Sequence, residues 1–408
     1  MADEGPRAPA DTPLALHPLV YLDEGEEVTI GRPDTDSYAI FPPDGAQLVR
    51  RLQDGATPAE AADWYEAEYG ERADVGDVVE ALHELGFVRT GDEAAGAGPA
   101  PVRWQRLGRA LFSPAAWACY AALTGWAAWR TVRSPDLVPS PHDLLFSDYY
   151  AVVNLVLLVV AVPLIAIHEC YHALAGRRLG LRSRTRLSYR FYFLVVETQL
   201  DGLVSVPRRK RYLPILAGML ADVVLLSVMV TVADAARGPG GDFTLTGRVC
   251  LGLAFATLMR LLWQFFLYLR TDVYVLITTW LGCVDLHTTA VQLLRNRLLR
   301  LLRRPERTAD ESAWHPVDRR VGRWYSWLIL GGYTVSLSTF LLGIGPVFLQ
   351  MITGSLDRFG AGAHTDGVRL LDAAVFLLLT LAQVGLTAVI YARERIRNRR
   401  ARPAHVIA

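Results

Sequence analysis

Hydrophobic positions are distributed differently in the two parts of the chain. Up to about residue 90 they alternate with polar positions in short pieces, whereas the later residues contain long runs that are almost wholly apolar. About 20 apolar residues are enough for a helix to cross the roughly 30 Å hydrocarbon layer of a bilayer. The predicted crossings are residues 114–129, 149–175, 212–235, 249–269, 325–350 and 370–391. The pattern predicts a mostly α-helical, polytopic membrane bundle of about six transmembrane helices behind a small N-terminal α+β domain.

Composition and charge agree with a membrane protein and predict its orientation. Of the 408 residues, 52% are hydrophobic and 20% are charged, which is less charge than the roughly 25% of a soluble domain. Arginine-rich segments fall on one side if the crossings alternate, and the positive-inside rule makes that side cytosolic. We therefore expect a multi-pass plasma-membrane protein with both termini in the cytosol. The net charge of +1 excludes a strongly basic nucleic-acid binder.

The N-terminal part has the pattern of a small folded domain. The pieces VYLDEGEEVTIGRP and YAIF predict a small antiparallel sheet. Three helices should follow, near residues 46–52, 58–69 and 75–85. Thr57 and Glu60 are spaced as the two partners of a capping box, so the second helix should begin at residue 58.

This order, with YAIF, LVRRLQDGATPAEAA and VVEALHELGFV in sequence, resembles the PqqD-like family of peptide-binding modules. The resemblance implies a winged-helix-like fold over residues 19–90 that captures the leader of a ribosomally made precursor peptide as an added strand. Another small winged-helix domain or a regulatory cap would fit the same pattern. We expect residues 1–18 to be disordered, 91–110 to form a flexible linker, 111–395 to form the membrane domain and 396–408 to form a cytosolic tail.

Charged residues end the second apolar run, in LIAIHECYHALAGRRLG. His168, Glu169 and His172 spell H-E-x-x-H, which on a helix places both imidazoles on one face with the glutamate beside them as a base. Burial of ionisable groups in a membrane is costly without a partner, and a metal ion is one such partner. The alternatives are a pair of ordinary core histidines, with Glu169 bound to Arg177 or Arg178, and a metal site without catalysis.

The segment IHECYHALAG resembles the site-2 protease family of intramembrane zinc metalloproteases. The resemblance implies a Zn²⁺ ion held by His168 and His172, with Glu169 as the catalytic base. A catalytic zinc needs a third protein ligand. Asp201, in a Leu-Asp-Gly sequence, and Asp272, near the end of the fourth crossing, are the two candidates.

The stretch that begins FFLYLRTDVYVL is similar to a family segment that reads Asn-Pro, four residues, Asp-Gly-Tyr. The similarity implies Asp272 as the third ligand, with Tyr274 beside it in the cleft. Phe266 and Leu267 replace Asn-Pro, and Val273 replaces the glycine. These departures indicate either a divergent substrate cleft or a weakened site.

A further similarity lies in RYLPILAGMLADVVLL, which resembles the family's AGP helix. Asp222 stands in this segment at a position where an asparagine is common. It would line the cleft together with Tyr274 and Asp201, or it would pair with Arg260 in the core.

The two halves together predict an intramembrane zinc metallopeptidase that removes the leader from a ribosomal precursor peptide, with the N-terminal module binding that leader. The expected partners are the precursor peptide and membrane lipid. One alternative is a regulated protease of a membrane protein such as an anti-sigma factor. Another is a non-catalytic, leader-binding membrane scaffold or immunity protein.

Overall fold

The computed structural model describes residues 11–25, 27–35, 37–89, 102–190, 193–312, 314–339, 341, 345–360 and 366–400. These residues are mostly helical, with small antiparallel sheets, which confirms the predicted fold class in outline. The chain forms two compact units. Unit 1 comprises residues 1–109, 173–184 and 199–213, and unit 2 comprises residues 110–172, 185–198 and 214–408.

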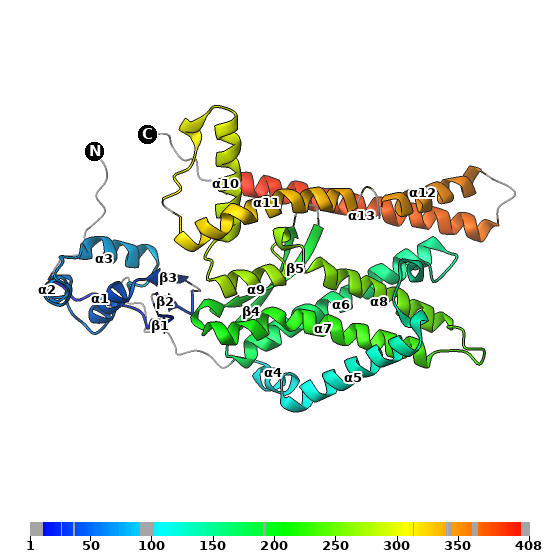
Figure 1. Cartoon of the computed structure of the whole chain (residues 1–408), viewed down its shortest axis with the longest axis horizontal. Helices are drawn as coiled ribbons and strands as arrows, with labels where there is room; N and C mark the ends of the chain where they lie inside the picture. The colour runs from blue at the N-terminus through cyan, green and yellow to red at the C-terminus, as the bar shows by residue number, and fades with distance from the viewer. Residues whose placement is uncertain are drawn as a thin grey trace. The chain divides into compact units, whose positions relative to one another are not determined.

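Unit 1 contains a three-stranded antiparallel sheet followed by three helices (Figure 1). The strands pair in the order β1, β2, β3, and Leu16 forms an isolated bridge to Val88 beside them. The elements are β1 (Val20–Asp23), β2 (Val28–Arg32), β3 (Ser37–Phe41), α1 (Pro43–Gln53), α2 (Pro58–Tyr69) and α3 (Val75–Glu84). The alternating pattern predicted this order of strands and helices.

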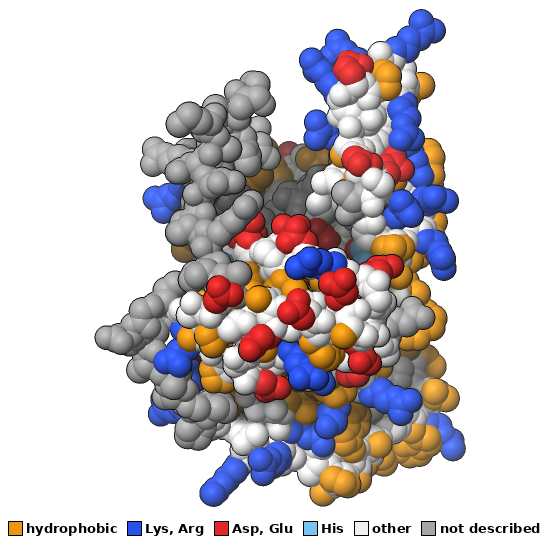
Figure 2. Space-filling view, turned by 90° about the vertical axis from the view of Figure 1, so that its left-hand side faces the viewer, with side chains coloured by type: hydrophobic (Ala, Val, Ile, Leu, Met, Phe, Trp, Pro, Cys, Tyr) orange, Lys and Arg blue, Asp and Glu red, His pale blue; other side chains and the backbone are white. Residues whose placement is uncertain are grey.

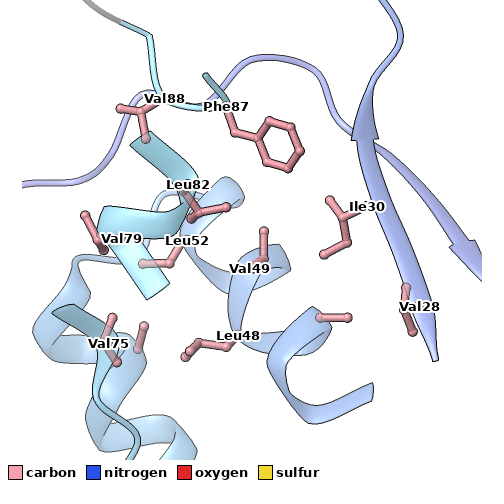
Figure 3. Close-up of a cluster of buried hydrophobic side chains, with 12 residues drawn as sticks. Val28, Ile30, Leu48, Val49, Leu52, Val75, Val79, Leu82, Phe87 and Val88 are labelled. Carbon is pink, nitrogen blue, oxygen red and sulfur yellow. The ribbon is translucent and has the colours of Figure 1, made fainter. Parts of the chain in front are cut away.

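A single hydrophobic cluster holds these elements together (Figure 3). Ile30 of β2, Leu52 of α1 and Leu82 of α3 are fully buried in it. Helix α2 begins at the predicted residue because the Thr57 hydroxyl accepts the Glu60 N–H and the Glu60 carboxylate accepts the Thr57 N–H. Such a cap contributes about 1 kcal/mol.

Unit 1 also includes the segment that leads into the third predicted crossing. The short helix η3 (Leu203–Ser205) packs against β1 and β2. Glu24, in the turn after β1, accepts hydrogen bonds from Arg208 Nε and Arg211 Nη2, each at 3.1 Å. The Glu24 and Arg211 side chains are only 15% and 11% exposed, so this ion pair is partly shielded from water.

Long helices make up most of unit 2, and two of them continue into unit 1. They are α5 (Pro114–Arg133), α6 (Tyr150–Arg178), α7 (Arg208–Ala235), α8 (Leu245–Trp263), α9 (Asp272–Leu281), α10 (Leu286–Leu301), α11 (Pro316–Thr339), α12 (Gly345–Gly360) and α13 (Gly367–Arg400). A hairpin of β4 (Arg182–Arg190) and β5 (Phe193–Asp201) follows α6. Figure 1 shows α12 running beside α13.

Four described helices are long and apolar enough to cross a membrane: α6, α7, α8 and residues 367–393 of α13. The other two predicted crossings are not confirmed. Residues 114–129 are helical, but their helix α5 is rich in alanine and ends in arginines. Residues 325–350 fall on two helices, α11 and α12, and residues 340 and 342–344 between them lie outside the described chain.

The predicted crossing 249–269 was too long. Helix α8 ends at Trp263, although the sequence after it is still mostly apolar. A short helix, η4 (Leu267–Leu269), follows. The ends of three predicted segments, residues 1–10, 90–101 and 401–408, lie outside the described residues. A further helix, α4 (Gln105–Leu111), begins within the predicted linker 91–110.

Candidate metal centre

His168 and His172 lie one turn apart on the same face of α6. Their ring centroids are 4.8 Å apart and their Nε2 atoms are 3.2 Å apart. Both residues are buried, at 6% and 8% exposed. Val159, Val162 and Ile167 on the same helix are exposed, as side chains that face lipid would be. Helix α6 thus presents its histidines to the protein and these apolar side chains outward.

Asp272 joins the two histidines from the first turn of α9. Its Oδ2 atom lies 3.3 Å from His168 Nε2 and 3.2 Å from His172 Nε2. Arg270, with a left-handed φ of 57°, turns the chain ahead of α9. The Asp272 N–H then donates to Gln264 Oε1 at 3.0 Å. The turn and this hydrogen bond fix the carboxylate beside the imidazoles.

Three features show that these residues fit a bound metal ion. One potential ligand atom from each of His168, His172 and Asp272 lies within 4.8 Å of the others. Apart from its contacts with the two imidazoles, Asp272 Oδ2 is buried without a hydrogen-bond partner among the described residues, and so is Oε2 of Glu169, the residue after His168. A Cβ built on Gly218 would overlap the Nε2 atoms of both histidines, so α7 keeps side-chain atoms away from these two potential ligand atoms. Two imidazoles and one carboxylate are a donor set that catalytic zinc uses.

Helix α7 holds both imidazoles from behind. His172 Nδ1 lies 2.8 Å from the Pro214 carbonyl oxygen, which can only accept, so Nδ1 carries a proton, and in the neutral imidazole Nε2 then has the free lone pair. His168 Nδ1 lies 3.0 Å from Asp222 Oδ2. Asp222 is fully buried and also pairs with Arg260 of α8. Pairing with Arg260 was one of its two expected roles.

The other predicted site residues lie elsewhere. Asp201 pairs with Arg184 at 3.1 Å within unit 1 and does not belong to the group of potential metal ligands. Tyr274 packs in an aromatic cluster with Tyr325 and His287. Neither side chain contributes a ligand atom in the described chain.

Glu169 does not pair with the arginines proposed for it. Within the described part of the chain, neither Arg177 nor Arg178 forms an ion pair with its carboxylate. Thr198 of β5 donates instead to the Glu169 backbone carbonyl at 3.3 Å. Glu169 itself is buried, at 8% exposed, and its Oε2 has no hydrogen-bond partner among the described residues.

Two residues that shape the site were not predicted from the sequence. Pro214 orients His172, and Gly218 makes room for both rings. Together with Asp222 they recur every four residues along α7, so they share one helix face. That spacing indicates that the three residues share a face, although it does not reveal which residues of another helix that face contacts.

We compared the chain with protein-family models, curated proteins and solved structures, and none of them matches it.

Proposed function

We propose that this chain is an intramembrane zinc metallopeptidase that removes the leader from a ribosomally made precursor peptide. The observation that carries the proposal is the convergence of His168, His172 and Asp272, whose potential ligand atoms lie within 4.8 Å of one another. Helices α6 and α7, which supply or hold the histidines, are both apolar enough to cross a membrane. A buried glutamate, Glu169, adjoins the group.

Each residue has a role in this proposal. His168, His172 and Asp272 would hold the zinc ion, which supplies Lewis-acid polarisation of the scissile carbonyl when bound. The Glu169 carboxylate would accept a proton from the attacking water as the new C–O bond forms. It would then give that proton to the departing amine as the C–N bond breaks. The absence of a hydrogen-bond partner for Oε2 in the described chain leaves that atom available for proton transfer.

The peptide would approach from the side of Asp272. The side chain of Asp272 is 25% exposed, whereas those of His168 and His172 are 7% and 10% exposed. A peptide bond within a helix has its carbonyl engaged, so the substrate would bind as extended chain. A cleavage site that lies in extended chain, between a folded leader and an unfolded core peptide, would meet that requirement.

The N-terminal module would bind the leader. Its resemblance to PqqD-like modules supports this role, and the strand order leaves β1 and β3 as the edges of the sheet. Tethering would raise the local concentration of the correct peptide at the protease. Nucleic acid is not proposed as a partner, because the exposed surface of α2 and α3 carries many acidic side chains (Figure 2).

We further propose that the chain crosses the plasma membrane several times with both termini in the cytosol. The support is the arginine bias of the segments between crossings. Reporter fusions at residue 1 and after residue 408 would test the orientation. A terminal reporter that is active only outside the cell would contradict it.

The zinc content of detergent-purified protein tests the metal site. We expect about one zinc per chain in the wild type, in Glu169→Gln and in Asp201→Asn, and little zinc in Asp272→Asn. Asp201→Asn is the matched control, because it removes the alternative aspartate. Wild-type protein that lacks zinc, when prepared without chelators, would contradict the proposal. Cleavage of a precursor peptide by wild type but not by Glu169→Gln would then test the activity.

A further inference from the structure

The two histidines of the metal centre have different partners behind them. His172 donates through Nδ1 to a neutral backbone carbonyl, that of Pro214. His168 faces a carboxylate, Asp222 Oδ2, at 3.0 Å. A carboxylate behind a ligating imidazole fixes the ring and strengthens its other nitrogen as a donor. The two imidazoles are thus unequal, although the motif makes them look equivalent.

Asp222 is itself held in place by Arg260. Arg260 Nε donates to Asp222 Oδ2 at 3.1 Å, and a second nitrogen of the guanidinium contacts Oδ1. This two-point contact fixes the plane of the carboxylate. Asp222 is completely buried, and Arg260 is 21% exposed at its side chain. The arrangement runs from α8 through α7 to α6.

A buried ion pair gives little stability by itself, because desolvation of the charges offsets their attraction. Stability alone therefore does not account for a charged pair between two apolar helices. The contact with His168 does account for it, since the carboxylate reaches the imidazole and the guanidinium at once.

We infer that Asp222, held by Arg260, is a positioning residue that sets the orientation and donor strength of His168 toward the metal. This inference rests on the proposed zinc site and deepens it. Asp222 does not touch the substrate in this scheme. It acts only through His168.

Zinc affinity of the full-length protein tests the inference, measured by competition with a chromophoric chelator. We expect Asp222→Asn, which keeps an acceptor but loses the charge, to weaken zinc binding about 10-fold, and Asp222→Ala to weaken it by up to about 100-fold. The visible spectrum of the Co²⁺-loaded protein should change in both variants, because it reports ligand geometry at the metal.

Two further variants separate positioning from a structural role. In Asp222→Leu/Arg260→Leu the ion pair is replaced by apolar side chains. Thermal stability should therefore be higher than in Asp222→Ala, while zinc affinity should stay below that of the wild type. Asp372→Asn is the matched control, because Asp372 is another buried aspartate paired with an arginine, Arg358, at 2.8 Å. It should lose stability and keep wild-type zinc affinity.

The outcomes distinguish the two proposals. Zinc in the wild type, with Asp222→Ala binding it as tightly, overturns the inference alone. Recovery of zinc affinity in the double leucine variant also overturns the inference, because the ion pair is then structural. A wild type that binds neither zinc nor Co²⁺ overturns the proposed metal site and the inference together.

Discussion

Gly218 contributes to the site because it has no Cβ atom. A Cβ at this position would overlap the Nε2 atoms of His168 and His172, the atoms that face the proposed metal. The close approach of α6 and α7 at this point therefore depends on glycine, although an alanine would favour the helix by about 1 kcal/mol. Glycine lowers the helix propensity at this position, but it allows the two imidazole rings to pack against α7.

Gly218→Ala should abolish zinc binding while leaving α7 helical. The added methyl would overlap the Nε2 atoms and displace both imidazoles from their present positions, whereas the backbone conformation suits alanine. Zinc content per chain and far-ultraviolet circular dichroism check the two halves of this prediction. Gly331→Ala is the control, because a Cβ there meets no atom within 4 Å. Full zinc occupancy in Gly218→Ala would show that the site does not lie between these helices.

Glu169→Gln should separate metal binding from hydrolysis. The amide cannot take a proton from water, so we expect turnover to fall by about 100-fold to 10,000-fold with zinc retained. Peptide cleavage assays and elemental analysis measure the two effects. Glu66→Gln, on the exposed surface of α2, should leave both unchanged. Loss of zinc in Glu169→Gln would make the glutamate a ligand instead of a base.

The residues of the site differ in how far the sequence could reveal them. His168, Glu169 and His172 are close in sequence, so helix geometry alone places them together. Asp272 lies a hundred residues later, and its place at the end of the fourth predicted crossing, together with the resemblance, favoured it over Asp201. The contacts of Gly218 depend on how α6 packs against α7, which no local pattern encodes.

Among the elements, the turn between α8 and α9 has the largest consequence for the site. The apolar run continues past Trp263, yet α8 ends there and α9 begins at Asp272. Hydropathy could not predict the end of α8, because the residues FFLYL after it are as apolar as those within the helix. By contrast, the start of α2 was predicted correctly because its cap is formed by residues three positions apart.

Gln264 ties this turn together, since its side-chain oxygen accepts the Asp272 N–H at 3.0 Å. Gln264→Leu should leave that N–H without its partner, let the start of α9 move and weaken zinc binding several-fold. Gln264→Glu keeps an acceptor and should bind zinc more tightly than Gln264→Leu. Chelator competition compares the two. Equal affinities in both variants would mean that other contacts hold Asp272.

At the scale of the whole molecule, Glu24 connects the turn after β1 to the first turn of α7. It contacts Arg208 and Arg211 in unit 1, and two of the three side chains are mostly shielded from water. We expect Glu24→Gln to weaken this attachment by about 1 kcal/mol, because the ion pair is partly buried. Hydrogen exchange of the amides in η3 and β2 should accelerate about 5-fold. Glu66 pairs with an exposed arginine, Arg72, so Glu66→Gln should leave this hydrogen exchange unchanged.

Arg211 and Pro214 both lie in the first two turns of α7. Arg211 binds Glu24 in the turn after β1, and the Pro214 carbonyl binds His172. Under the proposed function, a peptide that binds the sheet and disturbs Glu24 would therefore act on the helix that orients one of the proposed metal ligands. Equilibrium linkage is reciprocal, so if such a peptide changes zinc affinity by some factor, zinc must change peptide affinity by the same factor. If the proposed function holds, metal-free protein would then discriminate among leaders differently from the zinc-loaded protein, and peptide selection would itself depend on the zinc supply.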